Sequence, residues 1–478
     1  MAFLEFPSLA HHENKFSRGL ARKYNIMAKN EVKKNTDKMV FRGKRVLVMG
    51  LGLHGGGIDT VKFLAREGAH ITVTDLRSRH ALAFSLKALS SLRGITYILG
   101  RHRKDDFAKT DLIIKNPGVK PNTPYLFYAR KRGIPILSDV GIFLIRSPCR
   151  IIGVTGTRGK STTAHLIAAF LKTKYPRVFL GGNIRTSVLS FIDHARKNDK
   201  AVLELSSFQL QDIADIRISP SIAVLTNLMP DHLNWHSSRR NYFEAKRVIF
   251  RFQRPHDILF ANPEDKKVVR LAKSAPGRVA FPRLNPSLYP IVDARLGSHY
   301  RESVGLAMGV AAHLGVKKKA MERILAHFRG LEGRQELVRI VRGITFINDT
   351  TATMPEATIA ALHRFFFLKK NPARIILIAG GQNKKLLYRA LAAACAAQAG
   401  MLILLPGSAS DALMHALSGR IRDRLLHAKS MKHAVQSAWR NAHKGDVVLL
   451  SPGAASFGLF KNEFDRGRQF VNAIRALK

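Results

Sequence analysis

A glycine-rich segment that ends in lysine and serine carries the strongest chemical signal in the sequence. Residues 153–163 read GVTGTRGKSTT, after an apolar strand pattern and before an alanine-rich helix pattern over residues 164–171. The backbone N–H groups of such a turn and the positive end of the following helix attract phosphate oxygens. Lys160 would reach the outer phosphates of a triphosphate, and the hydroxyl of Ser161 would bind a magnesium ion. The segment therefore predicts a phosphate-binding loop.

This loop departs from the strict spacing, which places a glycine where Val154 stands. A glycine-rich turn without a ligand is the alternative. The strand, the Gly-Lys-Ser run and the helix nevertheless occur together in the order that phosphate binding needs. We expect the triphosphate to lie against a short run of residues, namely Gly156, Thr157, Gly159, Lys160, Ser161 and Thr162.

Two further polar side chains fall at the ends of expected strands. Glu204 lies near the end of the strand pattern 201–205, and His232 follows the strand pattern 221–226. Ligands of parallel sheets collect at the carboxyl ends of the strands, so we expect both side chains near the phosphate loop. Lys246 lies on the helix pattern 242–250. The alternatives are a surface glutamate, a structural histidine and a surface lysine.

A second glycine pattern occurs near the start of the chain. Residues 50–55 read GLGLHG after a strand pattern at 44–49, and Asp75 follows twenty residues after the last of these glycines. This βαβ arrangement is typical of a dinucleotide site. A glycine turn that serves only the packing of helix against sheet is the alternative.

Strand patterns alternate with helix patterns along the chain, which predicts an α/β protein with mostly parallel sheets. Because 478 residues are too many for one core, several domains are expected. We place a basic N-terminal arm at 1–40, a first α/β domain at 41–145 and the domain with the phosphate loop at 146–330. A third α/β domain, without its own phosphate loop, covers 331–478.

The composition narrows the class of protein. The formal net charge is +46, but lysine and arginine are scattered over the whole length, so we expect non-specific affinity for polyanions and no specific nucleic-acid partner. Apolar runs of about 18 residues are lacking, so no membrane insertion is expected. The N-terminus lacks the apolar core of a secretory signal, and two distant cysteines suit a reducing cytoplasm.

Several short stretches make residues 41–478 resemble the Mur ligase family. They are the phosphate loop, GNI at 182–184, ELSSFQL at 204–210, TN at 226–227, DH at 231–232, FIND at 346–349, LSP at 450–452 and AS…FKN at 455–462. The loop and the Asp-His pair fit all members, whereas ELSSFQL and the last stretches point to the glutamate-adding members. The resemblance implies three domains: a Rossmann-like N-terminal domain, a P-loop ATPase domain and a Rossmann-like C-terminal domain.

The resemblance also implies an activity. ATP, with Mg²⁺, would phosphorylate the carboxylate of UDP-N-acetylmuramoyl-L-alanine, and the amine of D-glutamate would then attack the acyl phosphate. Such a cytoplasmic enzyme would serve peptidoglycan synthesis, and we expect a monomer. An acyl phosphate forms where a carboxylate meets a triphosphate, so positioned cations are needed.

The resemblance assigns roles to individual residues. Catalytic roles fall to Lys160, Glu204, His232 and Lys246, and metal binding to Ser161, Glu204, His232 and a carbamylated Lys246. Arg334 and Asp349 would close over ATP. The nucleotide sugar would be bound by Gly52, Leu53, His54, Asp75, Leu76, Asn116, Gly118 and Asn183. Glutamate would be bound by Thr353, Lys384, Ser456 and Phe460.

Three alternatives stay open. Thr351 and Asn383 depart from the residues usual in the glutamate-adding members, so a ligase for L-glutamate or for another glutamyl acceptor is one of them. An NAD-linked dehydrogenase would use residues 50–55 but would leave the phosphate loop and Glu204 without a task. A nucleic-acid-binding GTPase or ATPase would show a guanine-reading Asn-Lys-x-Asp motif or an aromatic RNA-binding signature, and the sequence has neither.

Overall fold

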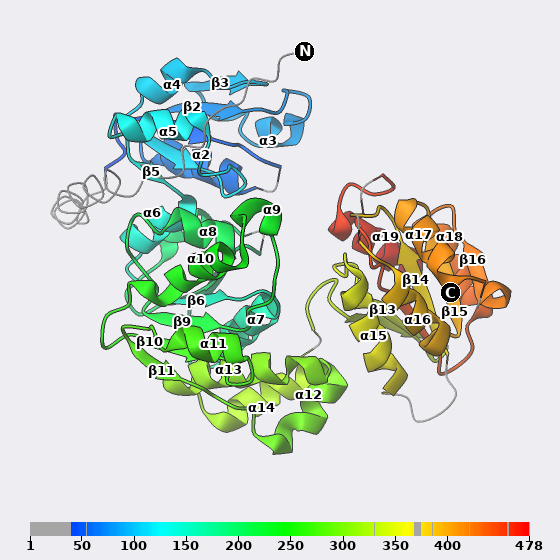
Figure 1. Cartoon of the computed structure of the whole chain (residues 1–478). Coiled ribbons are helices and arrows are strands. Elements are labelled where there is room, and N and C mark those ends of the chain that lie inside the picture. The colour runs from blue at the N-terminus through cyan, green and yellow to red at the C-terminus, as the bar shows by residue number, and fades with distance from the viewer. Residues whose placement is uncertain are drawn as a thin grey trace, which may run out of the picture. The chain divides into compact units, whose positions relative to one another are not determined.

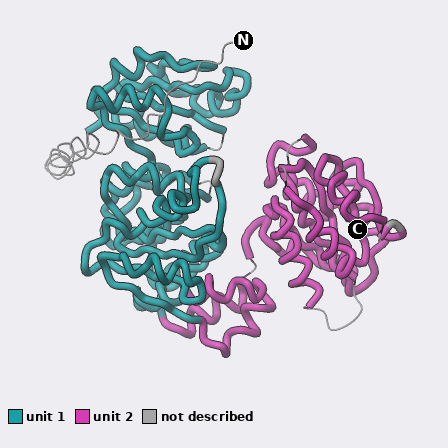
Figure 2. The backbone as a smooth tube through the Cα atoms, in the orientation of Figure 1, with its two compact units in different colours: residues 1–283, 306–316 teal, residues 284–305, 317–478 magenta. Residues whose placement is uncertain are grey.

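The computed structural model describes residues 40–478 apart from His54, Arg185, Arg329, 368–373, Lys385, Arg420, Phe457 and Lys478. The expected basic arm therefore lies, except for Val40, outside the described residues. The chain divides into two compact units, one of residues 1–283 and 306–316 and the other of residues 284–305 and 317–478 (Figure 2). Within the described ranges the strands form three sheets (Figure 1).

The first sheet has the order β3-β2-β1-β4-β5, and every pairing in it is parallel. Its strands are β1 (Arg45–Met49), β2 (His70–Asp75), β3 (Ile95–Leu99), β4 (Leu112–Lys115) and β5 (Ile136–Leu137). The helices between them are α2 (Gly56–Arg66), α3 (Ala83–Lys87), α4 (Lys104–Ala108) and α5 (Pro124–Lys131). The sequence pattern at 134–137 predicts a strand, of which β5 covers only the last two residues, and the sequence patterns predict no strand where β3 lies.

The second sheet has the order β11-β10-β9-β6-β8-β7 and is also parallel throughout. Its strands are β6 (Arg150–Thr155), β7 (Val178–Gly182), β8 (Lys200–Glu204), β9 (Ile222–Leu225), β10 (Ile258–Ala261) and β11 (Arg278–Ala280). Its helices are α7 (Lys160–Leu171), α8 (Ser207–Asp212), α9 (Leu233–His236), α10 (Arg239–Arg251) and α11 (Lys266–Ala272), with the 3-10 turns η1 (Val188–Ser190) and η2 (Ile192–His194).

The helix α6 (Asp139–Arg146) leads from the first sheet to the second and packs against both. Its apolar residues belong to one continuous core that also contains side chains from both sheets. Phe143, for example, contacts Phe191 edge to face, with ring centroids 5.3 Å apart. The first two sheets therefore share a buried interface within the first unit.

The third sheet belongs to the second unit and has the order β12-β13-β17-β14-β15-β16. Its strands are β12 (Glu336–Val341), β13 (Ile344–Asn348), β14 (Ile375–Gly380), β15 (Met401–Leu405), β16 (Leu425–His427) and β17 (Val447–Leu450). β12 pairs antiparallel with β13, and the other pairings are parallel. Its helices are α15 (Pro355–Phe367), α16 (Arg389–Gln398), α17 (Ser408–Leu417), α18 (Met431–Asn441) and α19 (Glu463–Arg475), with the 3-10 turn η5 (Arg422–Arg424).

The remaining helices lie between the second and third sheets in the sequence. They are α12 (Tyr289–Arg295), α13 (Arg301–His313) and α14 (Lys318–His327), with the 3-10 turns η3 (Pro286–Leu288) and η4 (Ser298–Tyr300). Among the described helices, none is long and apolar enough to cross a membrane. The predicted α/β class with mostly parallel sheets is confirmed.

Candidate active site

The phosphate loop connects β6 to α7, and its backbone has the shape that the glycines allow. Gly156 has a φ of +147°, and a Cβ atom there would lie 1.8 Å from Thr226 Oγ1. Gly159 precedes α7 with a left-handed φ of +78°. Only glycine adopts both conformations without strain. The third glycine, Gly153, lies within β6, where a Cβ atom would collide with Pro220, so it serves packing.

Residues at the end of β9 hold the loop in place. Thr226 Oγ1 donates to the carbonyl of Arg158 at 2.6 Å, and the Arg158 N–H donates to Asn227 Oδ1 at 2.8 Å. The first turn of α7 has no side-chain cap, so its backbone N–H groups point to the place where a phosphate would bind. Lys160 Nζ donates to the carbonyl of Thr157 at 3.0 Å, which folds the ammonium back over the loop.

Glu204 is the last residue of β8 and pairs in register with Val154 of β6. Its side chain is 2% exposed. Oε1 accepts a hydrogen bond from Asn183 Nδ2 at 2.9 Å, whereas Oε2 is buried and has no hydrogen-bond partner among the described residues. Leaving a buried charged oxygen unsatisfied is costly, so this atom fits a bound cation.

The donor set fits magnesium. Mg²⁺ prefers oxygen ligands, keeps several waters, and is usually held by one or two protein groups together with phosphates. Ser161, which is buried in the first turn of α7, and Glu204 could supply these groups. Over the described residues no group of three or more His, Cys, Asp and Glu could hold a metal ion.

Lys246 of α10 is 1% exposed, and its Nζ donates to the carbonyl of Gly156 at 2.8 Å. The ammonium also lies over the ring of Tyr242, 4.7 Å from its centroid. Burial and the nearby charge of Lys160 hold the pKa of Lys246 well below its usual value, against the opposing effect of Asp231 and Glu204. The amine is therefore biased toward its neutral, reactive form.

His232 follows β9 with a left-handed φ of +50°, and its Nε2 lies 3.7 Å from the carboxylate of Asp231. Burial lowers the pKa of His232, Asp231 raises it, and Lys160 and Lys246 lower it further. A neutral imidazole is the form that binds a metal. Lys246 contacts the loop at Gly156, Glu204 pairs with Val154 just before the loop, and His232 follows β9, which lies beside β6. These residues and Lys160 therefore lie at the carboxyl ends of neighbouring strands of the second sheet.

Two residues of this region were not predicted from the sequence as part of the site. Tyr242 OH donates to Thr157 Oγ1 at 3.3 Å, and burial raises the pKa of Tyr242 to about 12. His236 is buried, its Nε2 lies 3.0 Å from Ser207 Oγ, and burial lowers its pKa to about 4. The helical spacing of Tyr242 and Lys246, four residues apart, is the signal that could have placed the tyrosine beside the lysine.

At the end of the first sheet, Asp75 holds the glycine turn. Its Oδ2 accepts from the Gly52 N–H at 3.1 Å and its Oδ1 from the Arg77 N–H at 2.9 Å. Gly52 faces Asn116, whose Oδ1 accepts from the Gly118 N–H at 2.9 Å. Four of the residues expected around a nucleotide sugar therefore form one connected group, namely Gly52, Asp75, Asn116 and Gly118.

The other residues expected around the nucleotide sugar lie in different surroundings. Leu53 and Leu76 are exposed, and His54 lies outside the described residues. Asn183 lies in the second sheet's domain, where it donates to Glu204. It thereby connects the expected sugar-binding set to the expected metal ligand.

The second unit contains the residues expected over the outer face of ATP. Ser451 Oγ donates to Asp349 Oδ2 at 2.7 Å, and the Gln335 N–H donates to its Oδ1 at 3.2 Å. Burial raises the pKa of Asp349 to about 7, although these hydrogen bonds and the charges of Arg334 and Arg364 oppose the change.

The expected glutamate-binding residues also belong to the second unit. Phe460 N–H donates to the carbonyl of Ser456, and both side chains are buried. The Gln382 and Ala455 backbones exchange two hydrogen bonds, so the turn that carries Lys384 lies beside the turn that carries Ser456. Lys384 is exposed, and Thr353 is half-buried after β13.

Comparison with known families matches most of the chain. Residues 44–138 match the Mur ligase MurD-like N-terminal domain, residues 154–286 match the Mur ligase middle domain, and residues 333–453 match the Mur ligase glutamate ligase domain.

Two relatives illustrate the similarity in sequence. The UDP-N-acetylmuramoylalanine--D-glutamate ligase of Roseiflexus sp. (strain RS-1) is 39% identical over 92% of this chain and 100% of the relative. The protein of the same name from Borreliella afzelii (strain PKo) is 36% identical over 90% of this chain and 97% of the relative.

Solved structures share the fold. UDP-N-acetylmuramate-alanine ligase MurC from Thermotoga maritima has a TM-score of 0.57 at 19% identity and covers 91% of this chain and 100% of its own. The MurF ligase from Thermotoga maritima in complex with ADP has a TM-score of 0.55 at 17% identity, with coverages of 92% and 95%. With three matching domains and full-length relatives above 30% identity, the chain belongs to the Mur ligase family.

Proposed function

We propose that this enzyme joins D-glutamate to UDP-N-acetylmuramoyl-L-alanine in a reaction driven by ATP, in the synthesis of peptidoglycan precursors. The relatives that match over their full length bear the name of this ligase. The structural observation that carries the proposal is the buried Oε2 of Glu204, which lacks a hydrogen-bond partner in the described part of the chain and lies beside a phosphate loop that Lys246 contacts.

The proposed chemistry has two steps. A carboxylate oxygen of the UDP-sugar peptide attacks the γ-phosphorus of ATP, and ADP leaves. The amine nitrogen of glutamate then attacks the acyl carbon, inorganic phosphate leaves, and the amine releases a proton as the amide forms. Both steps bring anions together, so fixed cations stabilise the transition states.

The residues of this chain take distinct parts. The backbone of the loop, with Gly156, Gly159 and Lys160, holds and orients the triphosphate. Magnesium held by Ser161 and Glu204 would neutralise triphosphate oxygens when it is bound. Lys246, once carbamylated, and His232 are proposed as further metal ligands, because burial lowers the pKa of both side chains next to the loop.

The other substrates are assigned to the other domains. Residues 41–145 are proposed to bind the nucleotide sugar through Gly52, Asp75, Asn116 and Gly118. Residues 331–478 are proposed to bind glutamate through Thr353, Lys384, Ser456 and Phe460, and to reach ATP with Arg334 and Asp349. ATP and a uridine-diphosphate sugar are cytoplasmic metabolites, so the proposed reaction belongs to that compartment, and we propose a monomer.

An ADP-release assay tests the proposal. The purified chain is incubated with ATP and Mg²⁺, with or without UDP-N-acetylmuramoyl-L-alanine, and with D-glutamate, L-glutamate or neither. The product is identified by mass spectrometry. We expect ADP release and an amide product only with D-glutamate. If the amide product forms with L-glutamate and not with D-glutamate, the proposed amino-acid substrate is wrong. If ADP is released equally without the UDP-sugar, the proposed ligase activity is wrong.

A further inference from the structure

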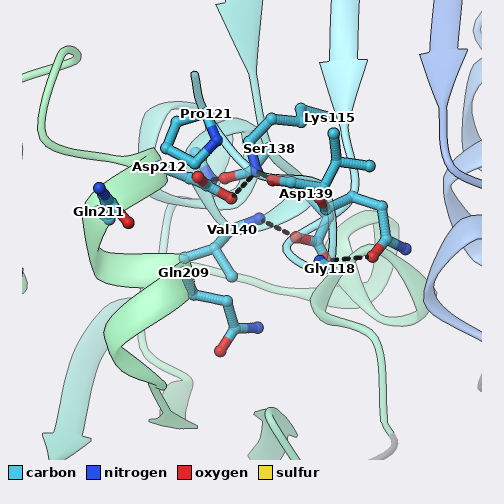
Figure 3. Close-up of polar contacts among 12 residues, drawn as sticks. Lys115, Gly118, Pro121, Ser138, Asp139, Val140, Gln209, Gln211 and Asp212 are labelled. Atoms are coloured by element: carbon cyan, nitrogen blue, oxygen red, sulfur yellow. Dashed lines mark hydrogen bonds and ion pairs between the residues drawn. The ribbon is translucent and has the colours of Figure 1, made fainter. Parts of the chain in front are cut away.

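A buried ion pair links the first two domains of the enzyme. Lys115 ends β4 of the first sheet, and Asp212 ends α8 of the second domain. The ammonium Nζ lies 2.9 Å from Asp212 Oδ2, and the two side chains are 3% and 4% exposed. Figure 3 shows the pair in the interface, with Asp139 and Gly118 close by.

The same ammonium closes the turn after β4. Lys115 Nζ donates to the carbonyl of Asn116 at 3.2 Å and to the carbonyl of Val119 at 2.6 Å. A lysine ammonium has three N–H donors, so two serve the turn while the charge is balanced by Asp212. This turn contains Asn116 and Gly118, which belong to the proposed site of the nucleotide sugar.

On the other side, Asp212 belongs to the helix that follows Glu204. α8 starts after a capping box in which Ser206 and Gln209 exchange side-chain and backbone hydrogen bonds. Gln211 accepts from Trp235 Nε1 at 3.1 Å, so α8 is also bound to the segment after His232. The helix α8 therefore connects the end of β8 to the ammonium of Lys115.

Stability alone does not account for this pair. Replacing a buried ion pair by apolar side chains of similar volume is often neutral or stabilising, because both charges must be desolvated. Burial disfavours both charged forms here, since it lowers the pKa of Lys115 and raises the pKa of Asp212 to about 7.

The other ionisable groups around the pair relieve this cost only in part. The charge of Asp139 from α6 raises the pKa of Lys115, which favours the ammonium, but it also raises the pKa of Asp212, which disfavours the carboxylate. Arg130 from α5 lowers the pKa of Lys115, and Asp215 raises the pKa of Asp212, so both oppose the charged forms. Asp59 from α2 in turn acts on Asp139. The energetic cost of the pair points to a use in function.

We propose that Lys115 is a positioning residue that fixes the turn of the nucleotide-sugar site against the helix following Glu204. The consequence is that the substrate carboxylate is presented to the triphosphate in a fixed position. A variant without this link would bind the sugar in a loosened turn and align it poorly, while the phosphate loop, which Lys115 does not contact, would keep its affinity for ATP. The inference rests on the proposed function.

The test measures KM for each substrate and the melting temperature in four variants. For Lys115→Met we expect the KM for UDP-N-acetylmuramoyl-L-alanine to rise roughly tenfold, with the KM for ATP nearly unchanged. Asp212→Asn should show a smaller effect in the same direction, because the ammonium still closes the turn. Lys115→Met/Asp212→Leu should regain the melting temperature of the wild type but keep the raised KM.

The control is the pair formed by Arg66 of α2 and Asp193 of η2, which joins the same two domains at 2.8 Å. Its side chains are 52% and 47% exposed, and neither residue belongs to the proposed sites. Arg66→Met should leave both KM values unchanged, which separates positioning by Lys115 from the general effect of removing an interdomain ion pair.

The outcomes distinguish the two proposals. If the wild type ligates and the double variant has a wild-type KM for the UDP-sugar, the pair is purely structural and the inference is wrong. Equal rises in both KM values would also overturn it. If the wild type releases no ADP with either glutamate, the proposed function fails first and the inference fails with it. Calorimetric titration with UDP-N-acetylmuramoyl-L-alanine alone should show the same loss of affinity in Lys115→Met.

Discussion

The ammonium of Lys246 donates a hydrogen bond to the carbonyl oxygen of Gly156, 2.8 Å away, although the two residues are 90 positions apart in the chain. The contact joins α10 to the phosphate loop at the residue whose conformation only glycine adopts easily. The chemistry of this lysine is therefore coupled to the shape of the loop.

For Lys246→Met we expect almost complete loss of ligation with the fold retained. The neutral amine that burial favours is the form that reacts with carbon dioxide, so ¹³C NMR of the wild type with labelled bicarbonate should show a carbamate that the variant lacks. Lys200→Met is the matched control, because burial also lowers the pKa of Lys200 but this residue lies outside the site. Full activity in Lys246→Met would contradict the assignment.

Glu204→Gln should reduce kcat by roughly a hundredfold or more, because it removes the charge from the buried carboxylate while it keeps the shape. Lys160→Ala should abolish ligation, because it removes the ammonium proposed to bind the triphosphate. Circular dichroism should show an intact fold in both variants. Glu264→Gln provides the control, since this carboxylate pairs with Arg283 on the exposed surface. Wild-type turnover in Glu204→Gln would exclude it from the active site.

Gly156→Ala should abolish ATP binding, measured by calorimetry. The added Cβ would lie 1.8 Å from Thr226 Oγ1 at a φ of +147°, so the loop must change its shape. Gly56→Ala is the comparison, because a Cβ there meets no atom within 4 Å and its φ is not in the left-handed region. We expect this second variant to be as stable as the wild type or about 0.4–1 kcal/mol more stable. Unchanged ATP affinity in Gly156→Ala would refute the role of the loop.

Asp75→Ala should raise the KM for the UDP-sugar far more than the KM for ATP. The substitution leaves the N–H groups of Gly52 and Arg77 without their acceptor, which costs roughly 1–3 kcal/mol and loosens the glycine turn. Steady-state kinetics with each substrate varied in turn would measure the difference. If neither KM changes, the first domain does not bind the sugar through this turn.

Stability should depend on pH through Asp349. Burial raises the folded-state pKa of Asp349 to about 7, above the value of an unfolded aspartate. Its protonated form is favoured in the folded state, so its contribution is fully present at low pH and is lost as the pH rises through about 7. We therefore expect Asp349→Asn to lose less stability than the wild type between about pH 5 and about pH 8, because the neutral amide cannot ionise in this range.

Chemical denaturation at both pH values measures this difference, and other ionisable groups cancel because both proteins share them. Parallel pH curves for wild type and Asp349→Asn would show that the carboxyl is not desolvated in the folded state.

Sequence patterns located only some of the strands, and neither burial nor a place at the edge of a sheet decided which ones. The apolar run 447–450 predicts a strand with the observed bounds of β17, because buried parallel strands are continuous apolar runs. β3 and β12, which are partly exposed and mix polar with apolar residues, were not predicted. The buried apolar strands β10 and β15 were not predicted either, because a short apolar run can equally belong to a buried helix. Arg466 is the clearest surprise, being fully buried, with its guanidinium donating to Thr350 and Ala454.

For the candidate site, local sequence patterns predicted some of the residues but not their contacts. The loop, Glu204 and His232 were predicted from motifs and strand ends, which are local in sequence. The contact of Lys246 with Gly156 and the pair of Lys115 with Asp212 depend on how distant elements pack, and no local pattern encodes that distance.

The strand order of the second sheet has a consequence for biosynthesis. β6 leaves the ribosome first of its sheet but lies in the middle of it, between β9 and β8, with β10 beyond β9. Until β9 has emerged, one edge of this apolar strand has no neighbour and can pair with other nascent chains. Parallel pairing between remote segments is also slow. Newly made chains should therefore depend on chaperones during the synthesis of residues 150–261.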